Sequence, residues 1–166
     1  MKLRLVENHE LQDAMSIING AKEDLKKQGI NQWQEGYPDI ECIQGDIQYG
    51  KGYFVVDEQN ILGYLCIDYD GEPAYKHLNG QWHTDENYVV VHRMAFRESA
   101  KGKGISTIVF QLVEEMSKLR GVCAFRVDTD KDNLKMQHIL TKNGFTYRGT
   151  IWFDYSEKIA FDKIIF

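Results

Sequence analysis

Residues 88–107 read YVVVHRMAFRESAKGKGIST and pass from an apolar run into a glycine turn. The run from Tyr88 to Phe96 is long, largely apolar and rich in β-branched residues, as is typical of a central strand. The clearest helical pattern of the chain follows at residues 104–120. Its apolar positions, three or four residues apart, are Ile105, Ile108, Val109, Leu112, Val113, Met116 and Leu119. The stretch therefore predicts a strand, a turn and a helix in succession.

The turn between this strand and this helix carries Lys101, Gly102, Lys103 and Gly104. Where a strand turns through glycines into a helix, unpaired backbone N–H groups and the positive end of the helix dipole meet at one point. Such a point suits an anion, above all phosphate. The turn lacks the Gly-Lys-Ser/Thr of a P-loop, and Thr107 stands where a dinucleotide fingerprint needs glycine. A plain structural turn is the alternative interpretation.

The elements around this stretch are predicted in mixed order. A strand over residues 2–7 precedes a helix that Asn8 caps and Gly29 ends, and a second helix is expected from Asp39 to about Tyr49. The other expected elements are strands at 53–56, 61–67, 122–127, 145–153 and 158–166 and a short helix at 133–142. Hairpin and crossover connections both occur in this order, which predicts one mixed α/β domain.

Composition narrows the function classes. The chain has 166 residues, 43% of them hydrophobic, which is enough for one domain with a core and a pocket. The net charge of −5 disfavours a general nucleic-acid binder. Charged residues appear at the N-terminus before any apolar run long enough for a signal peptide or a membrane span. Three cysteines without paired or metal-ligand spacing disfavour a disulfide framework. We expect a soluble, cytoplasmic protein with no metal, nucleic-acid or membrane partner.

Charge is unevenly distributed along the sequence. Residues 1–83 carry 7 Lys/Arg against 14 Asp/Glu, a balance of −7. Residues 84–166 carry 13 against 11, a balance of +2. One half therefore suits a cation and the other an anion, which is a hypothesis about two ligands of opposite charge.

Two segments resemble the coenzyme A-binding motifs of the GNAT superfamily of N-acetyltransferases. In that family a strand ending in a hydrophobic-Ala-Val type triplet is followed by R/Q-x-x-G-x-G/A, and here Arg93–Phe96 is followed by Lys101–Ser106. Lysine stands in place of Arg/Gln and serine in place of the last Gly/Ala, and both supply hydrogen-bond donors. Further on, Asn133–Phe145 resembles the second coenzyme segment, an Asn that opens a helix ending in Lys-x-Gly-Phe.

The resemblance implies the GNAT fold as one domain over residues 1–166. That fold is a mixed, mostly antiparallel central sheet of about six to seven strands flanked by about four helices, with a splayed parallel strand pair. The implied cosubstrate is acetyl-CoA. The implied coenzyme-binding residues are Met94, Ala95, Phe96, Lys101, Gly102, Lys103, Gly104, Ile105, Ser106 and Asn133.

Acetyl transfer to an amine needs a group that removes a proton and one that reprotonates the thiolate. His92 is the candidate base, because imidazole titrates near neutral pH, and a structural core histidine is the alternative. Strand alternation puts His92 on the face opposite Arg93. For the acid, Leu140 stands where many family members carry Tyr. Tyr147 is our candidate instead, with Tyr155 or an ordered water as alternatives.

The segment from Asn31 to Pro38 lies where the family's acceptor-binding loop is found, and we call residues 31–38 the acceptor loop. Trp33, Gln34 and Tyr37 are the candidate substrate-binding residues. Their aromatic rings, with carboxylates such as Glu35 nearby, suit a cationic amine. The alternative is that Trp33 and Tyr37 only anchor an irregular loop to the core.

We therefore expect an acetyl-CoA-dependent N-acetyltransferase in which a primary amine of a small molecule or peptide attacks the thioester directly. A non-catalytic acyl-CoA-binding regulatory module on the same fold is the alternative, motivated by Leu140. Homodimer formation is left open.

Overall fold

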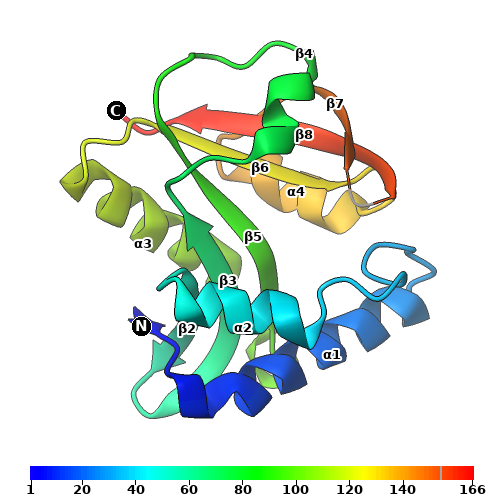
Figure 1. Cartoon of the computed structure of the whole chain (residues 1–166), viewed down its shortest axis with the longest axis vertical. Coiled ribbons are helices and arrows are strands. Elements are labelled where there is room, and N and C mark those ends of the chain that lie inside the picture. Colours follow the sequence, from blue (N-terminus) through cyan, green and yellow to red (C-terminus); the bar gives the residue numbers. More distant parts are fainter. Residues whose placement is uncertain (154) are drawn as a thin grey trace. The chain divides into compact units, whose positions relative to one another are not determined.

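The computed structural model describes residues 1–153 and 155–166, and within them it contains four α-helices and a sheet of eight strands (Figure 1). The helices are α1 (Leu11–Lys27), α2 (Ile40–Gln48), α3 (Ile105–Leu119) and α4 (Leu134–Lys142). The strands are β1 (Lys2–Leu5), β2 (Gly52–Asp57), β3 (Asn60–Asp68), β4 (Asn79–Gly80), β5 (Tyr88–Phe96), β6 (Ala124–Asp130), β7 (Thr146–Phe153) and β8 (Ser156–Ile164). The short 3₁₀ helices are η1 (Asn8–Glu10), η2 (Pro73–His77) and η3 (Glu98–Ala100). Across the described residues, no helix is long and apolar enough to cross a bilayer.

The sheet has the strand order β1-β2-β3-β5-β6-β8-β7-β4. β5 and β6 run parallel and pair Tyr88–Val90 with Ala124–Arg126. The pairs β1/β2, β2/β3, β6/β8, β7/β8 and β4/β7 are antiparallel. This confirms the mixed, mostly antiparallel sheet. The expected count of six to seven strands was too low by the two-residue β4, which is too short to produce a periodic pattern. The splay of the parallel pair stays a prediction.

Contacts divide the chain into two compact units. The first contains residues 1–67 and 91–109, and the second contains residues 68–90 and 110–166. In the first unit α1 and α2 pack against β2 and β3. This core contains Val6, Ala14, Ile17, Ile18, Ile43, Ile47, Phe54, Val56, Tyr64 and Ala95. Leu11, Met15 and Ala21 of α1 are partly buried and pack against this core.

The second unit is built around aromatic side chains. The ring of Phe125 lies 5.8 Å from that of Phe110 and 4.9 Å from that of Phe145, both edge to face. Arg126 projects from β6 between two further rings, 4.3 Å from the centroid of Trp82 and 3.8 Å from that of Tyr88. Burial lowers the pKa of this guanidinium. These contacts fasten the segment between β3 and β5 to β6.

The start of the first helix differs from the prediction. Asn8 does not cap α1 but opens η1, and the carboxylate of Glu10 accepts a hydrogen bond from the N–H of Glu7 at 2.9 Å. Arg4 holds the same carboxylate with two bonds of 2.9 Å. The turn is therefore fixed by a charged pair that reaches back to β1, which local capping rules do not reveal. Gly29, with φ +72°, follows α1 as expected.

Candidate functional site

The turn between β5 and α3 adopts the backbone conformation that its glycines predict. Gly102 and Gly104 have φ values of +74° and +68°, in the left-handed region that L-residues avoid. A Cβ at either glycine would meet nothing within 4 Å, so the backbone conformation and not crowding selects glycine. α3 begins at Ile105, and the first amides of a helix lack intrahelical partners. The exposed turn therefore presents N–H donors at the positive end of the α3 dipole.

The two lysines of the turn differ in their contacts. The ammonium of Lys101 forms an ion pair with Asp24 on α1 and lies 3.1 Å from the carboxylate of Glu98. The exposed Lys103 lines a cavity instead. Of the two predicted phosphate contacts, Lys101 is thus held by carboxylates, and a bound anion would have to compete with them.

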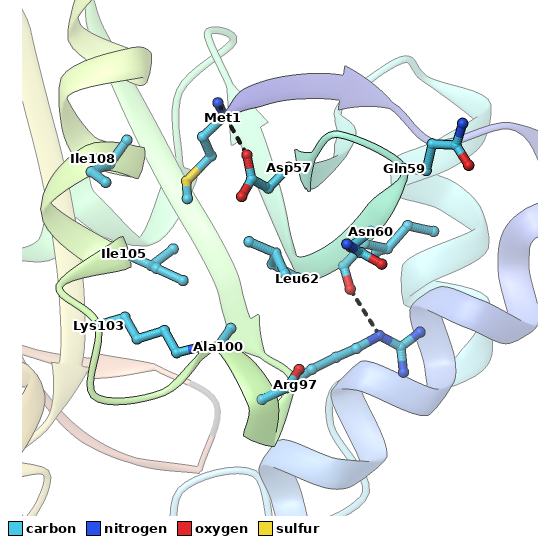
Figure 2. A pocket seen from close by; sticks show the side chains of 12 residues that line it. Met1, Asp57, Gln59, Asn60, Leu62, Arg97, Ala100, Lys103, Ile105 and Ile108 are labelled. Carbon is cyan, nitrogen blue, oxygen red and sulfur yellow. Dashed lines mark hydrogen bonds and ion pairs between the residues drawn. The ribbon is translucent and has the colours of Figure 1, made fainter.

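A cavity of about 730 Å³ flanks the turn within the first unit. Figure 2 shows Lys103, Ile105 and Ile108 along one side and Asn60, Leu62 and Arg97 along the other. The other lining residues are Met1, Asp57, Gln59, Ile61, Ser99 and Ala100. Its lining mixes apolar side chains such as Leu62 and Ile105 with polar ones, and Lys103 and Arg97 add positive charge.

β5 contains a left-handed residue just before its end. Arg93 has φ +54°, an uncommon conformation for a residue other than glycine, and such conformations cost about 1–3 kcal/mol each. Its Nε and Nη2 donate to the two carboxylate oxygens of Asp46 on α2, at 2.9 and 2.5 Å. Its Nη1 donates to Tyr37 Oη in the acceptor loop at 2.6 Å. The hydroxyl of Tyr64 on β3 donates to Asp46 at 2.6 Å. We call Tyr37, Asp46, Tyr64 and Arg93 the arginine network.

The arginine network is buried and charged. The side chains of Arg93 and Asp46 are 12% and 7% exposed. Burial favours the neutral guanidine, but Cys66, Tyr37 and Asp46 together raise the pKa of Arg93. Burial, and then the charge of Asp46, raise the pKa of Tyr64, so its phenol stays a donor. The ion pair is therefore held in its charged form.

His92 lies next to this network and carries no charge near neutral pH. Burial, together with the charge of Arg93 and Lys51, lowers its pKa to about 3, and Asp46 opposes the shift. The neutral imidazole can accept a proton but is a weak base. Asp46 thus binds Arg93 directly and also influences the pKa of His92.

The last residues of β5 pack tightly against β3. Ala95 is 4% exposed and belongs to the core of the first unit, whereas Met94 and Phe96 are partly buried. A Cβ at Gly63 of β3 would lie 2.6 Å from the ring of Phe96 and 2.7 Å from the carbonyl oxygen of Ala95. The strand end is therefore rigidly placed by side-chain packing as well as by pairing.

The acceptor loop is fastened to α1 as well as to β5. The amide of Gln34 donates to the backbone oxygens of Lys22 at 2.9 Å and Gln32 at 3.2 Å. The ammonium of Lys22 donates to the oxygen of Pro38 at 2.6 Å. Trp33 is partly buried and packs against the core of the first unit. Of the three candidate substrate residues, Trp33 and Gln34 thus have anchoring contacts, and Tyr37 belongs to the arginine network.

Four further residues considered in the sequence analysis belong to the second unit. Asn133 caps α4, and its side-chain oxygen accepts from the N–H of Met136 at 3.1 Å. Tyr147 on β7 is 54% exposed and packs edge to face on Phe161. Leu140, at the position where a Tyr is common, is fully buried. Tyr155, the alternative acid, is 80% exposed.

Asp46 and Tyr64 were not among the residues predicted from the sequence. Asp46 lies 47 positions before Arg93, and the amphipathic pattern of α2 gives no sign that one of its acids is buried. An arginine inside an apolar strand was the available signal, because a buried cation requires a partner.

Comparison with known proteins agrees with the mixed α/β fold. Residues 18–145 match the family model described as acetyltransferase (GNAT) family. A GNAT-family acetyltransferase from Streptococcus agalactiae 2603 is 30% identical in sequence and superimposes with a TM-score of 0.90, over 98% of this chain and 94% of that chain. The aminoglycoside acetyltransferase AAC(6')-Ib, solved with coenzyme A, shares the fold at 19% identity and a TM-score of 0.71, over 98% and 94%. The same enzyme has been solved with coenzyme A and kanamycin. No curated protein sequence gives a significant match.

Proposed function

Because this chain belongs to the GNAT family of acetyltransferases, we propose that it transfers the acetyl group of acetyl-CoA to a primary amine. The observation that carries the proposal is the glycine turn at the start of α3, with left-handed Gly102 and Gly104. The absence of side-chain atoms at both positions leaves the amides open to phosphate oxygens. A relative with the same fold, AAC(6')-Ib, binds coenzyme A, which supports this assignment.

In this proposal the turn holds the coenzyme through backbone and side-chain donors. The N–H groups at the start of α3 and the Ser106 hydroxyl bind the pyrophosphate, and Lys103 adds a charge from the cavity side. Lys101 contributes after exchanging Asp24 and Glu98 for a phosphate oxygen. Met94, Ala95 and Phe96 contribute main-chain groups to the pantetheine arm.

The chemistry requires no covalent enzyme intermediate. The bound ammonium first releases one proton to water, because a protonated nitrogen has no lone pair. The neutral amine nitrogen then attacks the thioester carbonyl carbon, a C–N bond forms, and the C–S bond breaks. The proton lost by the amine goes to His92, which is neutral because its pKa is about 3. In the proposal, the thiolate takes a proton from Tyr147, which recovers one from water. A base with so low a pKa accepts a proton only transiently and passes it on to water.

For the acceptor, we propose a cationic amine that binds at the acceptor loop. Tyr37 and Trp33 supply ring faces, and the exposed Glu35 supplies negative charge. Kanamycin, the ligand of the AAC(6')-Ib structure, carries several amines and is a reasonable first probe.

A second candidate function is a non-catalytic acyl-CoA-binding module. The fully buried Leu140 favours it, because α4 then offers no phenol at the position that commonly carries one. The two functions share coenzyme binding and differ only in turnover.

Calorimetric titration of the protein with acetyl-CoA tests the shared step. We expect saturable binding with a submillimolar Kd and competition by free coenzyme A. Absence of binding in this range would contradict both functions. Release of free thiol on adding kanamycin or spermidine then separates the enzyme from the module.

A further inference from the structure

Arg93 is a charged residue inside an apolar strand, and its backbone is left-handed. The neighbouring Val91 and Ala95 are 5% and 4% exposed, so the residue lies where solvent offers no compensation for a buried charge. A non-glycine residue keeps such a conformation only where its surroundings impose it, and such residues concentrate at functional sites. The contacts of Arg93 indicate what this conformation serves.

Two other members of the arginine network, Asp46 and Tyr64, lie in the protein core. Asp46 lies on α2 and Tyr64 on β3, and both are buried. Their hydrogen bond of 2.6 Å orients the carboxylate, which in turn receives two bonds from the guanidinium. The guanidinium is thereby held in one direction relative to α2 and β3.

Tyr37, the other residue that Arg93 binds directly, lies in an irregular segment. Tyr37 belongs to the acceptor loop, where the structure has neither helix nor strand. Because a guanidinium has only donors, the Tyr37 oxygen accepts the 2.6 Å bond, and such charge-assisted bonds are stronger than neutral ones. The guanidinium also lies 5.9 Å from the centre of the Tyr37 ring. Arg93 therefore links the acceptor loop to β5 and α2.

We propose that Arg93 is a positioning residue: through Tyr37 it holds the acceptor loop in place, and this contact sets the affinity for the amine. The inference rests on the proposed function, because it assigns the acceptor to this loop. The inference goes beyond that function, because the affinity for the amine then depends on the buried ion pair between Arg93 and Asp46 of α2. Acetyl-CoA affinity, which depends on the turn after β5, is independent of that contact.

Tyr37→Phe tests the proposal, since it removes the hydroxyl and keeps the ring. Tyr49→Phe is the matched control, because Tyr49 follows α2 directly and is 73% exposed. With kanamycin or spermidine as the amine, whichever is turned over faster, Tyr37→Phe should raise the amine KM five- to tenfold. It should leave kcat and the acetyl-CoA KM within twofold. Arg93→Met should raise the amine KM at least as much.

Hydrogen–deuterium exchange gives a readout that needs no turnover. In Tyr37→Phe the amides of the acceptor loop should exchange at least fivefold faster, while the α3 amides and all amides of Tyr49→Phe should keep the wild-type rates. If neither amine is acetylated but loop exchange accelerates, the proposed function fails and the positioning role stands. Unchanged loop exchange together with an unchanged amine KM in Tyr37→Phe would overturn the inference. A merely structural role would lower the unfolding midpoint and leave the amine KM unchanged, which also overturns it.

Discussion

At the scale of single residues, left-handed backbone occurs at two kinds of position around β5. Gly102 and Gly104 adopt it at little cost, because they have no Cβ. Arg93 adopts it at a cost, which its bonds to Asp46 and Tyr37 offset. The glycines could be predicted from the sequence because glycine turns have a known pattern. The left-handed Arg93 could not, because its conformation depends on a partner far away in the chain.

Gly104→Val tests the turn. Valine is strongly disfavoured at φ +68°, so the first amides of α3 should move and the affinity for acetyl-CoA should fall at least tenfold. Gly121→Val is the matched control: it has φ +70°, equally open surroundings and a place at the other end of α3. Both variants should lose similar stability, but only Gly104→Val should lose affinity in calorimetry. Equal affinity of the two variants would contradict a phosphate-binding turn.

His92→Gln tests the burial of the imidazole through pH. The pKa of His92 is about 3 in the folded protein and about 6.5 in the unfolded chain. Between these values only the unfolded chain binds the proton, so wild-type stability should fall by about 1.4 kcal/mol per pH unit as the pH drops from about 6.5 towards 3. Above this window the residue should contribute nothing to the pH dependence. The free energy of unfolding, measured by urea denaturation, should fall less from pH 7 to pH 5 in His92→Gln than in the wild type. Equal decreases in the two proteins would refute the low pKa of His92.

At the scale of elements, the contact between β3 and β5 depends on a missing side chain. Gly63→Ala would place a Cβ 2.6 Å from the Phe96 ring and 2.7 Å from the oxygen of Ala95. Overpacking of this kind costs about 1–3 kcal/mol, which should appear as a lower urea midpoint. Gly20→Ala, in open space on α1, should instead stabilise by up to about 1 kcal/mol. If Gly63→Ala left the urea midpoint unchanged, β5 would be free to shift.

The ion pair between α1 and the turn predicts a gain of affinity. In Asp24→Asn, Lys101 loses a competing carboxylate and becomes available to a phosphate. Because partly exposed ion pairs contribute about 0.2–1 kcal/mol, the Kd for acetyl-CoA should fall up to about fivefold at low salt. Glu23→Gln removes a charge from the exposed neighbouring position and should have a smaller effect. Weaker binding by Asp24→Asn would contradict a role for Lys101 in coenzyme binding.

Periodicity predicted the long elements well and the short ones poorly. α3 and β5 occur within one residue of their expected bounds, because their patterns extend over several turns or alternations. The two-residue β4 and the 3₁₀ turn η1 carry no such pattern, and they form through tertiary contacts such as the bonds from Arg4 to Glu10. Of the candidate site, the glycine turn could be predicted and the arginine network could not, since its four members are separated in sequence.

At the scale of the whole molecule, the charge asymmetry of the sequence takes another meaning. The first unit, residues 1–67 and 91–109, carries 10 Lys/Arg against 12 Asp/Glu, and the second carries 10 against 13. The two units therefore have nearly equal net charge, unlike the two halves of the sequence. The reason is that the basic turn belongs to the same unit as the acidic acceptor loop. The lysines of the glycine turn and Glu35 of the acceptor loop thus belong to one unit, where we propose that the coenzyme and the amine bind.

Acetyl transfer to an amine can be measured in a turnover assay. The protein is mixed with acetyl-CoA and a panel of primary amines that includes kanamycin and spermidine, free thiol is followed with time, and the products are identified by mass spectrometry. We expect thiol release that saturates with one amine and a product that has gained a single acetyl group on nitrogen. Saturable acetyl-CoA binding without acetylation of any amine in the panel would contradict it and favour the non-catalytic module.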